Sequence, residues 1–178
     1  MTGFPFARTL ALALFVVGAP PVWADMPARE ATPSGQVSAS VPPGTLAVGN
    51  DPATLVTAAK LAALPRRTVT TTQTGKDGEQ TRTWSGPLLW DVLVSAGDVD
   101  PAKHGEHSHL VLYVTGRDGY VATIALAELS PDFENKSVIV ADRLNDAPLP
   151  DHALRLIVPN DRRAGRSVRD LVRVVVGR

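Results

Sequence analysis

The chain contains no cysteine. A fold built from it cannot be cross-linked by disulfides, so the packing of apolar side chains must hold the structure together. The same absence excludes every chemistry that needs a thiolate, either as a nucleophile or as a metal ligand. The 178 residues are enough for one hydrophobic core and too few for two ordinary domains. We therefore expect a single domain, stabilised by its hydrophobic core without cross-links.

The N-terminus has the pattern of a secretory signal peptide. A positive charge at Arg8 precedes an apolar stretch over residues 10–19, and residues 22–24 (VWA) form a small-residue cleavage site. The apolar stretch is shorter than the roughly 20 residues that a membrane span needs. We predict a signal peptide over residues 1–24, a periplasmic or secreted protein, and no membrane span after cleavage. Retention of the segment as an anchor is the alternative.

Composition separates a linker from a folded domain. Residues 25–44 are rich in Pro, Ala, Ser and Gly and contain almost no large apolar side chains. Such a segment cannot offset the entropy that ordering costs. We predict a flexible linker over residues 25–44 and the domain over residues 45–178.

Turn chemistry predicts two β-hairpins in the domain. Threonine-rich segments at 67–73 and 80–85 flank a Gly-Lys-Asp-Gly turn. Runs of β-branched and aromatic residues at 110–115 and 120–124 flank a turn that contains Asp-Gly.

Apolar periodicity predicts two helices and several strands. One helical pattern runs over residues 55–62 and is stopped by Pro65, and a second is opened by Gly86-Pro87 and ended by Gly97. Shorter runs predict a helical turn at 126–129 and strands at 45–48, 137–141, 154–158 and 171–176, with a polar loop at 145–148. The fold class is therefore α+β, with a mostly β core and a few short helices.

Positive charge is concentrated at the C-terminus. The formal charge of the whole chain is zero, which indicates neither nucleic acid nor an acidic membrane as a partner. Residues 152–178, however, contain seven arginines against two acidic residues. The turn at 162–169 combines a glycine, whose backbone N–H groups bind anions, with arginines that donate paired hydrogen bonds to phosphate. We expect an anion site here, and a solvated arginine-rich turn is the alternative.

Three histidines lie within six residues. His104, His107 and His109 are candidate metal ligands, because imidazole is the commonest transition-metal ligand in proteins. The segment is expected to be a loop between a helix and a strand, where adjacent positions rarely orient ligands in advance. A solvated polar loop that binds Zn, Ni or Cu adventitiously is the alternative. No Gly-x-Ser-x-Gly motif is present to indicate a hydrolase.

Five motifs in order resemble a known family. Residues 84–93 (WSGPLLWDVL), followed by Ala96 and Gly97, resemble a segment of the molybdopterin-binding domain of sulfite-oxidase-type oxidoreductases. Further similar pieces are 116–120 (GRDGY), 138–150 (VIVADRLNDAPLP), 154–159 (LRLIVP) and 165–171 (GRSVRDL), so the resemblance covers about residues 45–176. It implies the sulfite-oxidase fold and a C-terminal turn that holds the pterin cofactor. The site residues that we assign to cofactor or anion binding are Arg155, Arg163, Gly165, Arg166, Ser167, Val168 and Arg169.

The resemblance breaks down at the molybdenum ligand. In the catalytic family a cysteine thiolate follows the first threonine-rich strand, whereas here residues 70–75 read TTTQTG. A hydroxyl is a hard donor and a poor substitute for a soft thiolate. Arg169 also stands where the family has a lysine. The chain resembles the short, exported, stand-alone members more than the full enzymes.

These observations lead to three functional hypotheses. The first is a non-catalytic or degenerate module that binds an anion, a pterin or an exported partner protein. The second is an active molybdopterin-dependent oxidoreductase that holds its cofactor without a protein thiolate, with Tyr120 and Asp118 as candidate catalytic residues. Turn formation by Asp118 and strand packing by Tyr120 are the alternative for those two residues. The third is a metal-binding protein that uses the histidine segment.

Overall fold

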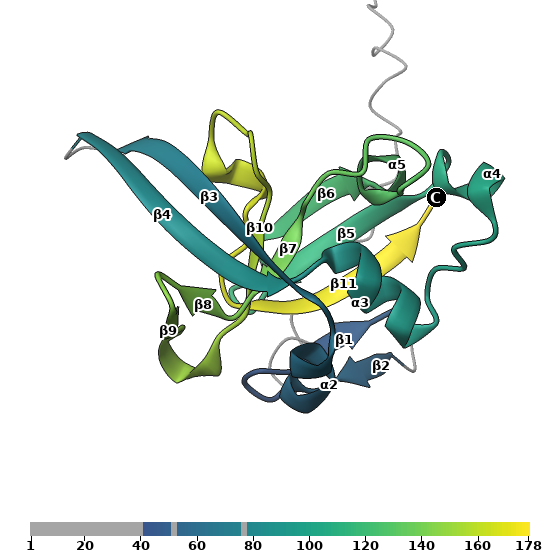
Figure 1. The fold of residues 1–178 in the computed structure, drawn as a ribbon. Helices are drawn as coiled ribbons and strands as arrows, with labels where there is room; N and C mark the ends of the chain where they lie inside the picture. Colours follow the sequence, from purple (N-terminus) through teal and green to yellow (C-terminus); the bar gives the residue numbers. More distant parts are fainter. Residues whose placement is uncertain (1–40, 51–52, 76–77) are drawn as a thin grey trace, which may run out of the picture. The chain divides into compact units, whose positions relative to one another are not determined.

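The computed structural model describes residues 41–50, 53–75 and 78–178 (Figure 1). The predicted signal peptide and most of the predicted linker lie outside these ranges. Val41, inside the predicted linker, is buried with Ala47 and Val172, so packing contacts extend to residue 41. Within the described ranges, no helix is both long enough and apolar enough to span a membrane.

Short strands and shorter helices alternate along the chain. The strands are β1 (Leu46–Val48), β2 (Thr54–Val56), β3 (Arg66–Gly75), β4 (Gly78–Pro87), β5 (Val111–Gly116), β6 (Val121–Ala125), β7 (Ile139–Ala141), β8 (Arg143–Leu144), β9 (Ala147–Pro148), β10 (Arg155–Ile157) and β11 (Leu171–Gly177). The α-helices are α2 (Ala58–Ala63), α3 (Leu89–Ala96), α4 (His104–His107) and α5 (Leu126–Leu129). Two 3₁₀ turns are η2 (Pro150–His152) and η3 (Ala164–Arg166).

The strands of the described ranges form three sheets. The largest has the order β2-β1-β11-β5-β6, in which β1 is parallel to β11 and the other pairs are antiparallel. The second pairs β10 with β7, and the third has the order β3-β4-β8-β9. In Figure 1 the far end of the β3–β4 hairpin extends away from the five-stranded sheet. The order of the five-stranded sheet places the C-terminal strand β11 in its middle, next to β1, the first described strand.

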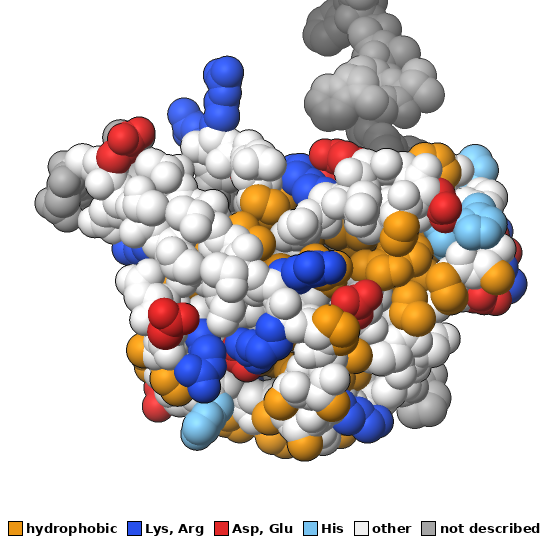
Figure 2. All heavy atoms as spheres, viewed as in Figure 1, with side chains coloured by type: hydrophobic (Ala, Val, Ile, Leu, Met, Phe, Trp, Pro, Cys, Tyr) orange, Lys and Arg blue, Asp and Glu red, His pale blue; other side chains and the backbone are white. Residues whose placement is uncertain are grey.

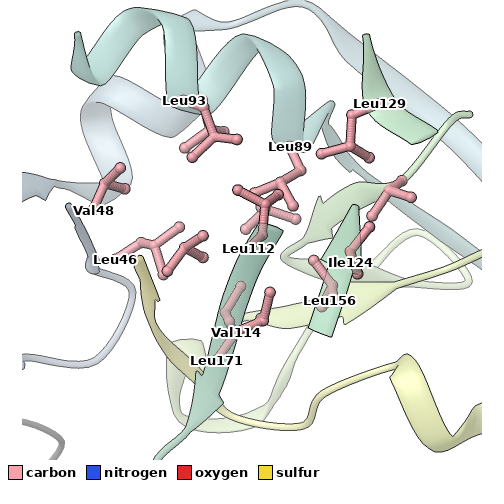
Figure 3. Close-up of a cluster of buried hydrophobic side chains, with 14 of the residues drawn as sticks. Leu46, Val48, Leu89, Leu93, Leu112, Val114, Ile124, Leu129, Leu156 and Leu171 are labelled. Atoms are coloured by element: carbon pink, nitrogen blue, oxygen red, sulfur yellow. The ribbon is translucent and has the colours of Figure 1, made fainter. Parts of the chain in front are cut away.

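Helix α3 covers the five-stranded sheet and closes the main core. Its buried side chains Leu89, Val92 and Leu93 fall on one face, as the apolar spacing predicts. They meet buried residues of the sheet, among them Leu112 and Leu171 (Figure 3). Because the chain has no cross-links, burial of this apolar surface is the main stabilising contribution.

A second apolar cluster joins the hairpin to the β7–β10 pair. It contains Val69, Trp84, Ile139, Ala141 and Ile157. The backbone of Gly86 approaches β7 so closely that a Cβ atom there would lie 2.0 Å from the carbonyl oxygen of Val140. The glycine in the motif at 84–93 therefore has a packing function.

The predicted fold class is confirmed: the structure is sheet-rich and mixed, with a few short helices. Both predicted hairpins form, as β3–β4 and β5–β6. The predicted second helix forms as α3 and ends at Gly97 in the left-handed conformation (φ 78°), although its Pro87 ends β4 instead of opening the helix.

Three local predictions were wrong. Leu55 is not helical: it lies in β2 and pairs with Ala47, and the helix begins only after Thr57, whose side chain accepts a hydrogen bond from the Lys60 backbone. Half of the predicted loop at 145–148 is a strand: residues 147–148 form β9, and only 145–146 form the turn of the small β8–β9 hairpin. The predicted histidine loop contains helix α4. β2 pairs with β1 and β9 pairs with β8, and apolar periodicity reports neither pairing.

Candidate functional site

A pocket of about 350 Å³ lies where β10, the turn before β11 and the end of β5 meet. Its lining residues are Pro43, Arg117, Leu149, Pro150, Asp151, Ala153, Leu154, Arg155, Arg169 and Asp170. Two of the arginines predicted to bind an anion, Arg155 and Arg169, are thus brought together. The pocket has three arginines and two aspartates in its wall, so its character depends on how these charges pair.

Arg117 and Asp170 pair with each other. The Nε of Arg117 donates to the Asp170 carboxylate at 3.1 Å, and its Nη1 donates to the carbonyl oxygen of Val41 at 3.0 Å. The Arg117 backbone N–H also donates to the Asp170 carbonyl oxygen at 2.8 Å. This pair neutralises one arginine and one aspartate and holds the chain next to Arg169.

Arg155 carries a charge that no carboxylate in the described part of the chain neutralises. Its guanidinium stacks on the ring of Trp84, with 4.8 Å from Cζ to the ring centroid, and its buried Nε has no hydrogen-bond partner. Burial lowers the pKa of Arg155, and the positive charges of Arg169 and Arg82 lower it further. A half-buried cation next to other cations is unfavourable in isolation, and an anion in the pocket would relieve both costs.

Arg166 does not line this pocket. Its guanidinium donates to both oxygens of Asp161, at 2.9 and 2.7 Å, and to both oxygens of Glu128, at 2.9 and 3.0 Å. Lys136 joins the same network through Glu128, at 3.3 Å, and Asp161, at 3.9 Å. The sequence predicts an anion-binding role for Arg166, but the structure surrounds it with acidic side chains, so it joins η3 to α5.

This network predicts a pH dependence of stability. Hydrogen bonds from Arg166 lower the pKa of Asp161; burial raises the pKa of Glu128, but Arg166 and Lys136 outweigh that effect and the net pKa is lowered. Because the folded-state pKa values lie below the ordinary 3.8 and 4.5, the network stabilises the protein above those values, and the stabilisation is lost as the pH falls through the folded pKa values.

We expect Arg166→Leu to lower the free energy of unfolding at neutral pH by about 1 to 2 kcal/mol, since the carboxylates lose one cation and keep Lys136. Urea unfolding at pH 7 and at pH 3 measures this. The difference between variant and wild type should shrink at pH 3, because this pH lies below the ordinary pKa values of 3.8 and 4.5 and the carboxylates of the unfolded chain are then protonated. A difference that is equally large at both pH values would contradict an electrostatic role.

The other predicted residues of the C-terminal turn have structural contacts. The Ser167 hydroxyl accepts a hydrogen bond from the Val158 backbone at 3.2 Å, and Val168 is buried in the main core. Gly165 supplies a carbonyl oxygen that accepts the Tyr120 hydroxyl at 2.6 Å. Arg163 is exposed and does not line the pocket. The structure therefore places only Arg155 and Arg169 of the predicted set at the pocket.

The candidate catalytic residues form part of a turn. Asp118 accepts a hydrogen bond from the Tyr120 backbone N–H at 3.0 Å, which is the local bond that favours Asp in turns. Tyr120 is half exposed, and its hydroxyl bonds to η3. The Asp118 contact matches the structural alternative for that residue, whereas Tyr120 precedes β6 and is not packed in a strand. Neither residue lines the pocket.

Two of the three predicted metal-binding histidines come together. His104 and His107 lie on α4 with Asp132 close to both, whereas His109 is exposed and outside this group. Asp132 was missed because it is 25 residues further along the chain than His107. Trp84 was also missed as a site residue, because an apolar aromatic in a strand predicts packing as readily as a contact with a cation.

Comparisons with known proteins identify the fold and the family of this chain. The fold is that of molybdopterin-binding domains of the sulfite-oxidase type. The oxidoreductase molybdopterin binding domain family matches residues 48–178, and the chain belongs to this family. A search among curated proteins found no match.

A solved structure supports the fold. The crystal structure of the sulfane dehydrogenase SoxCD from Paracoccus pantotrophus is similar, with a TM-score of 0.56 and 19% sequence identity. The match covers 74% of this chain and 37% of that chain. The chain thus spans little more than a third of the length of the matched chain, and at this identity the likeness concerns the fold.

The donor atoms of this chain do not fit a thiolate-bound molybdenum centre. The segment that corresponds to the family's cysteine is part of β3, and the chain has no cysteine at any position. The hydroxyl of Thr71 accepts a hydrogen bond from Trp84 Nε1 at 3.0 Å, and that of Thr72 bonds to Thr81 at 3.2 Å. These hydroxyls are weakly acidic and already bonded to the neighbouring strand, so they offer no soft anionic ligand.

Proposed function

We propose that the domain is an exported, non-catalytic member of its family that binds a small phosphate-like anion in the Arg155 pocket. The observation that carries the proposal is the environment of Arg155: a half-buried guanidinium on Trp84, beside Arg169, with an unsatisfied Nε and no carboxylate partner in the described chain. Buried cations without partners are costly, and function is the usual reason that they persist.

Export is part of this proposal. It rests on Arg8, the apolar stretch over residues 10–19 and the small residues before Asp25. Export also fits a chain that needs no disulfides, because its apolar clusters hold the fold together without cross-links.

A second candidate is a protein that holds molybdopterin through the arginines, without a thiolate. Family membership favours it, because the pterin of such cofactors carries a phosphate that arginine forks bind. The two candidates share an anion site and differ in whether molybdenum is present.

Molybdenum and pterin analysis separates the two candidates. Protein isolated from its native host should contain neither stoichiometric molybdenum nor a fluorescent pterin after oxidative release. A cysteine-ligated molybdopterin enzyme from the same host serves as the positive control for cofactor supply and release. One molybdenum per chain, together with turnover of an oxo-transfer substrate, would overturn the non-catalytic proposal. Pterin without molybdenum would identify the anion while leaving the module non-catalytic.

A further inference from the structure

His104, His107 and Asp132 lie together on a part of the surface that the anion pocket does not use. In Figure 2 pale-blue histidine side chains are exposed where Figure 1 places α4, with acidic side chains nearby. The potential ligand atoms of the three residues all lie within 4.8 Å of one another. Asp132 Oδ2 is 2.5 Å from His104 Nδ1 and 4.0 Å from His107 Nδ1, so it lies between the two rings.

The hydrogen bonds of His107 determine which ring nitrogen carries the proton. Its Nε2 lies 3.0 Å from the carbonyl oxygen of Asp100, which can only accept, so in the neutral ring the proton is on Nε2. Nδ1 therefore carries a lone pair, accepts a hydrogen bond from the Ser130 hydroxyl at 3.0 Å and lies 4.0 Å from Asp132 Oδ2. A carbonyl partner on the opposite nitrogen is the arrangement that orients metal-binding histidines in proteins.

The ring of His107 is also held in place. Its side chain is only 2% exposed, and it makes an edge contact with Trp90 at 5.1 Å between ring centroids. His104 and Asp132, in contrast, have 63% and 44% of their side chains exposed and can adjust. One rigid ligand and two adjustable ones suit a site that closes around an ion.

We propose that His104 Nδ1, His107 Nδ1 and an Asp132 carboxylate oxygen bind one divalent transition-metal ion, with Zn²⁺ as the best match. Two imidazoles and a carboxylate exclude the hard ions Mg²⁺ and Ca²⁺ and suit zinc, with water as the fourth ligand. At bond lengths of about 2.0 to 2.1 Å, tetrahedral ligand atoms lie about 3.3 Å apart, so closure needs movements of about 1.5 Å at most. The Ser130 hydroxyl then gives up its bond to Nδ1.

The experiment uses the full chain without an affinity tag. Calorimetry monitors a titration with Zn²⁺, and visible absorption spectra monitor a separate titration with Co²⁺. Wild type should bind one Zn²⁺ with micromolar or tighter affinity, and Co²⁺ should give the intense visible bands of a tetrahedral site. Asp132→Asn and His104→Ala should each weaken zinc binding about tenfold or more. These exposed ligands are the primary variants, because substitution of the buried His107 also perturbs packing.

The chain offers matched controls. His109→Ala and His152→Ala remove the two remaining histidines and should leave zinc affinity unchanged. Arg155→Met should leave it unchanged as well, which separates this site from the proposed anion pocket. Absence of binding at micromolar zinc would overturn the site, as would retained affinity in the Asp132→Asn and His104→Ala variants or an equal loss in His109→Ala.

Discussion

Gly86→Ala is expected to lower the free energy of unfolding by about 3 kcal/mol. The added methyl group would lie 2.0 Å from the Val140 carbonyl oxygen and 2.8 Å from the Ala141 Cα, and these are backbone atoms that cannot rotate away. Relief of the clash requires β4 and β7 to separate, which opens the second apolar cluster. Chemical denaturation followed by tryptophan fluorescence measures the effect, because Trp84 belongs to this cluster.

Gly165→Ala is the matched control. No atom lies within 4 Å of the position that an added methyl group would take at Gly165, and its φ is compatible with alanine. We expect its stability to stay the same or to rise by up to about 1 kcal/mol, because alanine restricts the unfolded chain. Equal stability of the Gly86→Ala variant and wild type would show that β4 and β7 are not in close backbone contact.

Arg155→Met is expected to remove most of the anion affinity while leaving the fold intact. A charge-assisted hydrogen bond contributes about 1.5 to 3 kcal/mol, so affinity for pyrophosphate should fall roughly tenfold to a hundredfold. Methionine retains an unbranched apolar chain against Trp84 and removes a buried, unsatisfied Nε. Stability should therefore change by less than about 1 kcal/mol. Calorimetry at low ionic strength measures the affinity for pyrophosphate, and urea unfolding measures the stability.

Two further arginines give this experiment its specificity. Arg169→Met should also weaken pyrophosphate binding, since Arg169 lines the same pocket. Arg163→Met removes an exposed arginine outside the pocket and should leave binding unchanged. A uniform loss in all three variants would indicate a diffuse charge effect, and no loss in Arg155→Met would overturn the proposed anion site.

Local chemistry made much of the fold predictable. The β3–β4 and β5–β6 hairpins form where the sequence predicts them. Gly78 (φ 97°) and Gly119 (φ 82°) adopt backbone conformations that other residues avoid. Gly97 ends α3 for the same reason. The pairing of β1 with β11 was not predictable, since it joins residues such as Val48 and Val174 from opposite ends of the domain.

The candidate sites were only partly predictable. The sequence indicates a positively charged C-terminal segment and a histidine cluster, but it does not show which charges are already paired. Asp161 lies only five residues from Arg166, so an ion pair between them was predictable from the sequence. Glu128, in contrast, contacts Arg166 only in the folded chain. The same holds for Asp132, which replaces His109 in the metal-binding group.

The sequence by itself determined which functional groups the protein can use. Without cysteine, no thiolate can bind molybdenum in any fold of this chain, and turn residues and apolar spacing determined the hairpins and α3. Only the tertiary structure decided that Arg166 has carboxylate partners while the buried Nε of Arg155 has no hydrogen-bond partner, and which carboxylate joins the histidines. The physical reason is range: turns and helix ends depend on adjacent residues, whereas burial and ion pairing depend on groups that approach one another only when the chain is folded.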